Sequence, residues 1–277
     1  MISIIKEDKP DKNWNNRLLK SGLGTIYQSK ERGLFLEKQN VPTYFIKFLN
    51  NSGEIVGQLL VSLRTRYDSK DLKSRILKHT PIIPKISCEW SYGPIIFDPK
   101  FHSEIYSTLE NFLKTQKFYV KGWTHPMANT NPTKLSKPFI IRPWGTFVID
   151  LSKSKDQIYS NIAKHSGRKN IERSIKRGVK IEEINKRSLL EYYDLISVTK
   201  NESSRKTSDF KFLERRWEMF KPLGFSGFLA RYNDKPIGGL LFTYMNGYII
   251  EIGIARSQFD TQNHLYSQDL LKWNLIK

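Results

Sequence analysis

The chain has one cysteine, Cys88, and its five histidines are scattered along 277 residues. A single cysteine excludes an internal disulfide and a cysteine-rich zinc site, and the histidines show none of the close spacings that metal sites use. No run of about 18 apolar residues occurs, so no membrane-spanning helix is predicted. The first twelve residues lack the apolar core of a signal peptide, so a cytoplasmic location is expected.

Acidic residues are also scarce relative to basic ones. Lysine and arginine number 46 against 27 aspartates and glutamates, which gives a formal net charge of +19. The basic excess is 10 in residues 1–150 and 9 in residues 151–277, so it is not confined to a tail. A positive field of this extent attracts polyanions such as nucleic acid, phosphorylated metabolites and anionic membrane surfaces. The alternative is a lysine-rich proteome that uses lysine for solubility.

Glycine-rich phosphate-binding motifs are missing. The sequence has no P-loop and no G-x-G-x-x-G pattern, and the segment Arg256–His264 contains no glycine. An acyl-CoA transferase would place a glycine-rich turn here, whose backbone N–H groups bind pyrophosphate at a helix N-terminus. Side chains block that close approach. A CoA site of this kind is therefore not expected, and no other cofactor is indicated.

The length predicts two domains, which we place at residues 1–145 and 146–277. The proline-rich stretch 124–143 is the candidate junction or substrate-facing loop. Hydrophobic periodicity predicts an α+β fold, in which helices cover mainly antiparallel sheets. The predicted strands are 44–49, 54–63, 118–123, 146–151, 179–184, 227–232, 235–244 and 247–255, and the predicted helices are 13–21, 103–116, 154–177, 188–200, 210–220 and 265–277.

The most distinctive local feature is a strongly basic stretch inside the predicted helix 154–177. Its apolar residues Ile158, Ile162, Ile171 and Ile175 recur at helical spacing and predict a buried stripe. The basic residues then lie on the flanks and the solvent face as a cationic ridge, suited to binding phosphates. The alternative is a solvated helix face without a ligand. The ridge residues are Arg168, Lys169, Arg173, Lys176 and Arg177.

Several spaced patterns together resemble the FemABX family of aminoacyl transferases. The resemblance covers nearly the whole chain and consists of spaced patterns rather than an invariant signature. The resemblance is clearer in the second half of the chain. The matching segments are Thr146–Leu151, Arg168–Val179, Phe228–Tyr232, Pro236–Gly239, Ile252–Ala255 and Asp269–Trp273, with weaker agreement at Gly24–Ser29 and Tyr92–Ile95.

The resemblance implies two tandem domains of the GNAT (acyl-CoA N-acyltransferase) fold. It implies transfer of an amino acid from aminoacyl-tRNA to an amine of a peptidoglycan precursor, without a covalent enzyme intermediate and without CoA. Both substrates carry phosphates, and catalysis would rest on orientation and on stabilising the tetrahedral oxyanion. Peripheral contact with an anionic membrane surface is compatible with this activity.

The resemblance also implies site residues. Arg205 stands where a family arginine binds the precursor's phosphates, and Lys206 follows it. Tyr27 and Gln28 belong to the expected acceptor site, and the ridge is suited to tRNA. The family often has an aromatic residue and a lysine shortly after the position of Gln28; here Lys30 and Arg32 are the candidates to replace them. The family's catalytic lysine would lie beyond Lys277, so no catalytic residue is assigned and a C-terminal truncation is expected.

Two alternatives stay open at this point. One is a GNAT-type N-acyltransferase that uses acyl-CoA or another acyl donor on a small amine, for which saturable CoA binding is the test. The other is a non-catalytic RNA-binding protein, whose affinity would fall with salt in proportion to the phosphates it contacts. Neither the transferred group nor the acceptor follows from the sequence.

Overall fold

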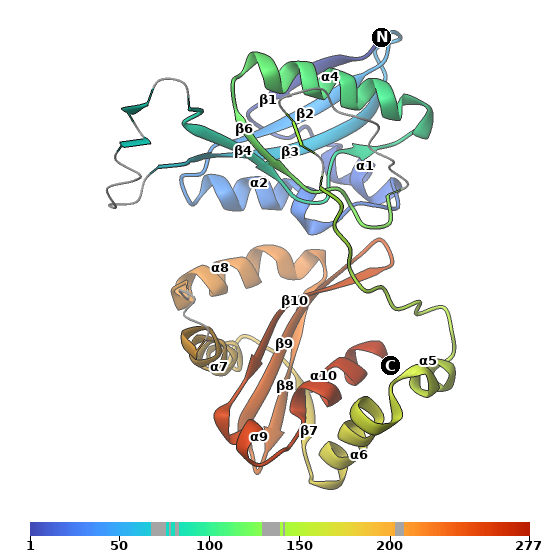
Figure 1. The fold of residues 1–277 in the computed structure, drawn as a ribbon, viewed down its shortest axis with the longest axis vertical. Helices are drawn as coiled ribbons and strands as arrows, with labels where there is room; N and C mark the ends of the chain where they lie inside the picture. Colours follow the sequence, from blue (N-terminus) through green and yellow to red (C-terminus); the bar gives the residue numbers. More distant parts are fainter. Residues whose placement is uncertain (68–75, 78, 81–82, 129–138, 141, 203–207) are drawn as a thin grey trace. The chain divides into compact units, whose positions relative to one another are not determined.

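A computed structural model describes residues 1–67, 76–77, 79–80, 83–128, 139–140, 142–202 and 208–277. The chain divides into two compact units, Met1–Thr146 and Phe147–Lys277 (Figure 1). The expected boundary lay between residues 145 and 146. Among the described residues, none of the helices has the length and apolarity that a membrane span requires.

The first unit is built on a six-stranded sheet whose main path runs β1-β2-β3-β4-β6, with β5 paired to β3. All pairs are antiparallel except β4 with β6, which is parallel. The strands are β1 (Ser3–Glu7), β2 (Thr43–Leu49), β3 (Ile55–Thr65), β4 (Ile86–Trp90), β5 (Ile95–Ile96) and β6 (Tyr119–Gly122). The helices are α1 (Trp14–Lys20), the 3₁₀ turn η1 (Ile26–Gln28), α2 (Lys30–Glu37), the 3₁₀ turn η2 (Pro99–Phe101) and α4 (His102–Thr115).

Helices cover both faces of this sheet, with α4 on one face and α1 and α2 on the other (Figure 1). The spacing of Ile105, Leu109 and Leu113 places all three on one side of α4, where they are buried against the sheet. On the other face, Trp14 of α1 packs edge-on against Phe45 of β2, with ring centroids 4.9 Å apart. The sheet is therefore buried between two helical layers.

The second unit has a four-stranded antiparallel sheet in the order β10-β9-β8-β7. Its strands are β7 (Lys180–Glu183), β8 (Phe225–Tyr232), β9 (Lys235–Met245) and β10 (Tyr248–Arg256). Its helical elements are α5 (Lys155–Asn161), the π-helix η3 (Lys164–Arg168), α6 (Lys169–Lys176), α7 (Leu189–Glu202), α8 (Phe210–Phe220), the 3₁₀ turn η4 (Lys221–Leu223), α9 (Gln258–Gln262) and α10 (Ser267–Ile276).

Two adjacent glycines let helices approach β9 from both faces. Neighbouring residues of a strand point to opposite faces. A Cβ at Gly238 would collide with Ser267 of α10, and a Cβ at Gly239 would lie 2.6 Å from the ring of Tyr192 in α7. The pair Gly238-Gly239 therefore marks the strand on which α7 and α10 converge from opposite sides.

Two of the sequence predictions need correction. Residues 146–151 form no strand. The side chain of Phe147 is fully exposed, at 103%, and that of Val148 is 58% exposed. Alternating apolar residues suit a strand, but a strand also needs a neighbour to complete its hydrogen bonds. Within the described part of the chain, none of the strand pairings includes this segment.

The predicted helix 154–177 is also interrupted. Ser154 begins α5 with the expected capping box to Gln157, but the chain turns extended at Ile162 before η3 and α6 follow. The break changes the helical phase, so the four isoleucines do not form one buried stripe. Ile175 is 58% exposed, and Ser174 takes the buried position.

A network of charges joins α1 to the first two strands. Arg17 donates two hydrogen bonds to Asp11, of 2.6 and 3.1 Å, and Lys47 lies 3.6 Å from Asp11 and 2.7 Å from Glu7. Burial by itself would raise the pKa of Asp11. The hydrogen bonds from Arg17 and from the Asn13 backbone, with the charges of Arg17 and Lys47, outweigh burial and lower the pKa below its usual value.

We expect Asp11→Asn to lower the free energy of unfolding by about 2 kcal/mol at pH 7, because the charged hydrogen bonds are lost. A carboxylate whose pKa is lowered by folding stabilises above its unfolded pKa and loses that contribution as the pH falls through the folded value. Urea denaturation at several pH values should therefore show the gap between wild type and variant closing in acid. Exposed Asp8→Asn is the control, and a gap that persists to about pH 2 contradicts the assignment.

Candidate functional site

The first unit contains a cavity of about 410 Å³ lined by aromatic and charged side chains. The aromatic residues are Tyr27 from η1, Trp90 and Tyr92 at the end of β4, and Trp123 and Trp144 from the segments after β6. The charged residues are Arg32 of α2, Arg64 of β3, Glu89 of β4 and Lys121 of β6. Elements distant in sequence thus meet at one site.

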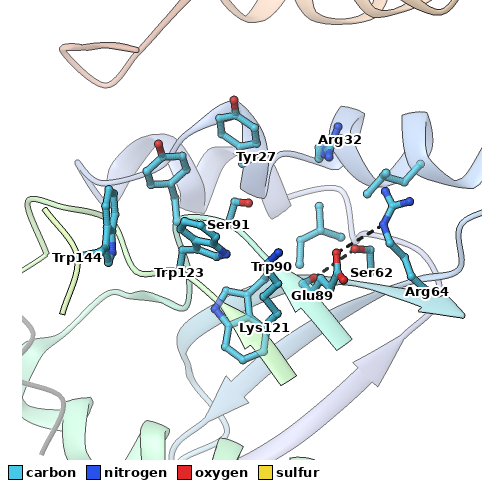
Figure 2. Close-up of a pocket in the computed structure, with 13 residues that line it drawn as sticks. Tyr27, Arg32, Ser62, Arg64, Glu89, Trp90, Ser91, Lys121, Trp123 and Trp144 are labelled. Carbon is cyan, nitrogen blue, oxygen red and sulfur yellow. Dashed lines mark hydrogen bonds and ion pairs between the residues drawn. The ribbon is translucent and has the colours of Figure 1, made fainter. Parts of the chain in front are cut away.

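The cavity is divided into two chemically different ends (Figure 2). The rings of Tyr27, Trp123 and Trp144 gather at one end, and Arg32, Arg64 and Glu89 lie at the other. Glu89, the one acidic residue of the lining, is 3.6 Å from the guanidinium of Arg64. Three cations against one carboxylate leave the cavity positive, so it suits an anionic ligand that also carries a flat or apolar part.

The aromatic end is a chain of ring contacts around Tyr92. Its ring centroid lies 5.2 Å from that of Tyr27, 5.7 Å from that of His125 and 6.5 Å from that of Trp144. Tyr92 has a positive φ of 56°, which is uncommon for a side chain of this size. Burial, with the neighbouring Tyr27, raises the pKa of the Tyr92 phenol. Tyr92 is therefore a neutral hydroxyl at neutral pH, able to donate or accept a hydrogen bond.

Gln28 is placed under the cavity instead of in its lining. Its side chain is fully buried and hydrogen-bonds three backbone groups: it accepts from Leu60 N–H at 2.8 Å and donates to the carbonyls of Ser91 and Leu60 at 2.8 and 3.3 Å. Its own carbonyl accepts from the Trp14 indole at 2.8 Å. Gln28 therefore ties η1, which carries Tyr27, to β3 and to the loop after β4.

We expect Gln28→Ala to lower the free energy of unfolding by about 3 kcal/mol, because it leaves buried backbone groups without partners. The variant should also disturb the Tyr27–Tyr92 wall. Urea denaturation measures the first effect and near-ultraviolet circular dichroism the second. Gln116→Ala, an exposed residue after α4, is the control. Equal stability of the two variants would show that the Gln28 network contributes little.

His125 supports the same wall from behind. It is buried, and its Nδ1 accepts a hydrogen bond from the backbone N–H of Met127 at 3.1 Å, which requires the neutral ring. Burial lowers the pKa of His125. The turn that begins at His125 starts two residues after Trp123, whose carbonyl accepts from Gly93 N–H at 3.0 Å. Protonation of His125 would thus strain the turn that orders Trp123 and Tyr92.

The lowered pKa of His125 predicts a pH-dependent stability. Between the folded pKa and the usual value near 6.5, the unfolded chain binds the proton more readily, so stability falls as the pH falls through that window. We expect His125→Gln to reduce this dependence. Part of it should remain because burial also lowers the pKa of His102. Denaturant titrations between about pH 4.5 and 8 measure it. Exposed Gln116→Ala, which removes no titratable group, should leave the profile unchanged; a profile equally unchanged in His125→Gln would refute the assignment.

In the second unit, four of the five ridge residues lie on η3 and α6, and Arg177 is the residue that follows α6. Arg177 donates to the backbone carbonyls of Asn263 and His264 and so holds α6 against the chain before α10. The guanidinium groups of Arg173 and Arg177 also lie 5.8 and 5.7 Å from the ring centroid of Tyr266. Arg177 is therefore a structural anchor as well as a surface cation.

Lys169 and Lys176 are exposed, as are Arg173 and Arg177, and Arg168 is half-buried. In the part of the chain that the structure describes, no ion pair involves any of these five residues. The ridge therefore keeps its net positive charge, which is the condition for binding phosphate. Arg205 and Lys206, predicted to bind substrate, lie outside the described residues.

A third feature lies where β10 meets α10. Asp260 of α9 is fully buried, 2.7 Å from Nε of Arg256, and its carboxylate accepts hydrogen bonds from the backbone N–H and the hydroxyl of Ser267 at 3.2 and 2.9 Å. Ser267 is the first residue of α10, so a side chain of the protein already occupies the N-terminus of this helix. The glycine-free segment thus contains a short helix, α9, whose residue Asp260 places a carboxylate at the N-terminus of α10.

Sequence reasoning missed most of the cavity. Arg64, Lys121, Trp123 and Trp144 were assigned no role, since they lie on different elements and only the sheet brings them together. Asp260 was missed as well, although the pattern Ser257-x-x-Asp260 is a helix N-cap signal, and the Ser257 hydroxyl does accept from Asp260 N–H at 3.1 Å. Of the candidates Lys30 and Arg32, only Arg32 is among the lining residues. Among the described residues, no cluster of metal ligands occurs.

No protein-family model and no curated protein sequence matches the chain. Solved structures do match it. FemX is 12% identical, with a TM-score of 0.70 over 98% of this chain and 85% of FemX. A conserved protein of unknown function from Bacteroides thetaiotaomicron VPI-5482 is 11% identical, with a TM-score of 0.51 over 99% and 86%. A tandem GNAT protein from the clavulanic acid biosynthesis pathway is 7% identical, with a TM-score of 0.47 over 99% and 84%.

The similarity to FemX confirms the predicted resemblance at the level of the fold. The predicted α+β class, with mainly antiparallel sheets flanked by helices, is confirmed as well. At these identities the similarity concerns the fold alone, so the function has to be argued from the sites.

Proposed function

We propose that this chain is an acyl transferase of the FemABX type, which moves an amino acid from aminoacyl-tRNA to the amine of an anionic, phosphate-bearing precursor. The FemX-like fold supports transfer of an acyl group to an amine. The observation that carries the choice of donor is the buried Asp260 at the N-terminus of α10.

An acyl-CoA donor is disfavoured by that carboxylate. A helix N-terminus binds pyrophosphate through free backbone N–H groups and the positive end of the helix dipole. At α10 the carboxylate of Asp260 takes the Ser267 N–H and puts a negative charge where a CoA pyrophosphate would have to lie. A donor held by surface cations avoids this repulsion, and the ridge on η3 and α6 offers them.

The cavity of the first unit is proposed as the acceptor site. Its cationic end suits the phosphates of a nucleotide-linked or lipid-linked precursor, with Arg32 and Arg64 as donors. Its aromatic end, at Tyr27, Tyr92 and Trp123, suits a flat or apolar part of the same molecule. Arg205 and Lys206 remain proposed contributors to phosphate binding.

The reaction itself balances without a cofactor. The amine nitrogen forms a bond to the ester carbonyl carbon, the bond from that carbon to the ribose oxygen breaks, and the proton lost by the amine ends on the leaving hydroxyl. Orientation of the two substrates and stabilisation of the tetrahedral oxyanion both contribute to the rate enhancement in such a reaction. The proposal therefore assigns binding roles to the residues named above and leaves the proton carrier unassigned.

The test combines transfer and binding. Mixed aminoacyl-tRNA with labelled amino acids is incubated with a UDP-linked muramyl peptide and the protein, and the label in the peptide is measured. Filter binding of the same tRNA is then followed against salt. We expect Lys169→Gln and Lys176→Gln each to make the slope of log K against log salt shallower by about 0.7 to 0.9. Lys20→Gln on α1 removes one charge from the other unit and should leave the slope unchanged.

The outcomes separate the alternatives. Transfer together with a ridge-dependent slope supports the proposal. If the protein binds tRNA but transfers no amino acid to the UDP-linked peptide, to a lipid-linked peptide or to a simple amine, the result favours a non-catalytic RNA-binding protein. Saturable CoA binding by calorimetry, strengthened by Asp260→Asn, would contradict the donor assignment and favour an acyl-CoA enzyme.

A further inference from the structure

A second, smaller cavity of about 320 Å³ lies in the second unit, between the β8–β9 turn and the start of α9. Its walls include Tyr232, Pro236, Ile237 and Phe259, and Lys235 stands at its rim. The rings of Tyr232 and Phe259 have centroids 6.1 Å apart and planes inclined by 37°. Phe259 is 48% exposed, so one large aromatic surface faces solvent beside a cation.

The walls of this cavity are held in place by tight local structure. Asn233 and Asp234 both have positive φ, 48° and 59°, as a two-residue type I′ hairpin requires, and this turn sets Tyr232 opposite Lys235. Phe259 is the second residue of α9, which Ser257 caps. The ion pair between Arg256 and the buried Asp260 ties α9 to β10. The aromatic surface is therefore preorganised.

The cavity lies near Arg177, the last residue of the cationic ridge. The carbonyl of Phe259 accepts a hydrogen bond of 3.0 Å from the N–H of Asn263, whose own carbonyl accepts from Arg177. The first residue of β7, Lys180, pairs across the sheet with Arg231, which precedes Tyr232. Neighbouring residues of a strand point to opposite faces, so Lys180 and Arg231 lie on the other face from Tyr232. Lys235 is therefore the cation that lines the cavity with the aromatic pair, and Arg177 binds the segment that follows α9.

Aromatic surfaces interleaved with cations are the pattern that binds single-stranded nucleic acid, since every base has a face that can stack and each base is followed by a phosphate. A small cavity admits one base, whereas a flat duplex end would not enter it. We propose that one unpaired base of the donor RNA stacks on the exposed face of Phe259 at this cavity, with the ring of Tyr232 supporting Phe259 and Lys235 on the adjacent phosphate. This inference rests on the proposed RNA donor and adds a base-binding site to the phosphate-binding ridge.

The test uses an RNA hairpin with a short single-stranded 3′ extension and the same hairpin with abasic riboses in the extension. Fluorescence anisotropy measures both affinities at one salt concentration. We expect Phe259→Ala to weaken binding of the first RNA by about 5- to 150-fold, the range for one stacked base, and to leave the abasic RNA unaffected. Phe259→Tyr should restore affinity, since it keeps the ring.

A matched control is Phe147→Ala, which removes another exposed phenyl ring from the same unit. It should change neither affinity, and Lys235→Gln should make the salt slope for both RNAs shallower by about 0.7. Equal binding of the two RNAs that still depends on Lys169 and Lys176 would overturn the base-stacking inference and leave the proposed donor intact. Absence of binding to either RNA would overturn both.

Discussion

A single buried carboxylate organises the second unit. Asp260 is inaccessible to solvent, and it joins the end of β10, through Arg256, to the first turn of α10, through Ser267. An unpaired charge in this position would be costly, so the ion pair and the two hydrogen bonds have to form together. Their formation sets the path of the chain from Arg256 to Ser267, which includes α9, the anchor points of Arg177 and the exposed ring of Phe259. The donor side of the proposed enzyme thus depends on one charge that is itself out of reach of any ligand.

The first unit uses a neutral group for the same purpose. The side chain of Gln28 has both donor and acceptor atoms, so it can satisfy backbone groups on β3 and on the loop after β4 at once. Gln28 itself carries no charge, and the cations Arg32, Arg64 and Lys121 lie in the cavity above it. The two units therefore share one arrangement. In each, a buried polar side chain is hydrogen-bonded by the protein's own backbone and side chains, and this network positions surface residues that are suited to bind phosphates. A net charge of +19 then acts where ligands approach instead of within the core.

Local patterns predicted many of the elements well. The ends of α4 and α8, the hairpin turns at Asn233-Asp234 and Asn246-Gly247, and the capping box at Ser154 follow from periodicity, positive φ and capping chemistry, all of which act over a few residues. The predictions that were wrong depend on interactions over longer distances along the chain. Residues 146–151 have the alternation of a strand, but no neighbouring strand pairs with them in the described residues. The break at Ile162 altered which isoleucines are buried, because helical phase is a property of the whole segment.

The sequence by itself determined the α+β class, the basic character of both units, the ridge residues of α6 and the lack of a glycine-rich phosphate loop, because composition, periodicity and short motifs depend on near neighbours in the chain. Only the tertiary structure decided that Tyr27, Arg32, Arg64, Lys121 and Trp144 share one cavity, that Gln28 supports that cavity from below, and that Asp260 occupies a helix N-terminus. These facts depend on strand order and register, which place residues tens of positions apart within contact distance, and no local pattern in the sequence carries that information.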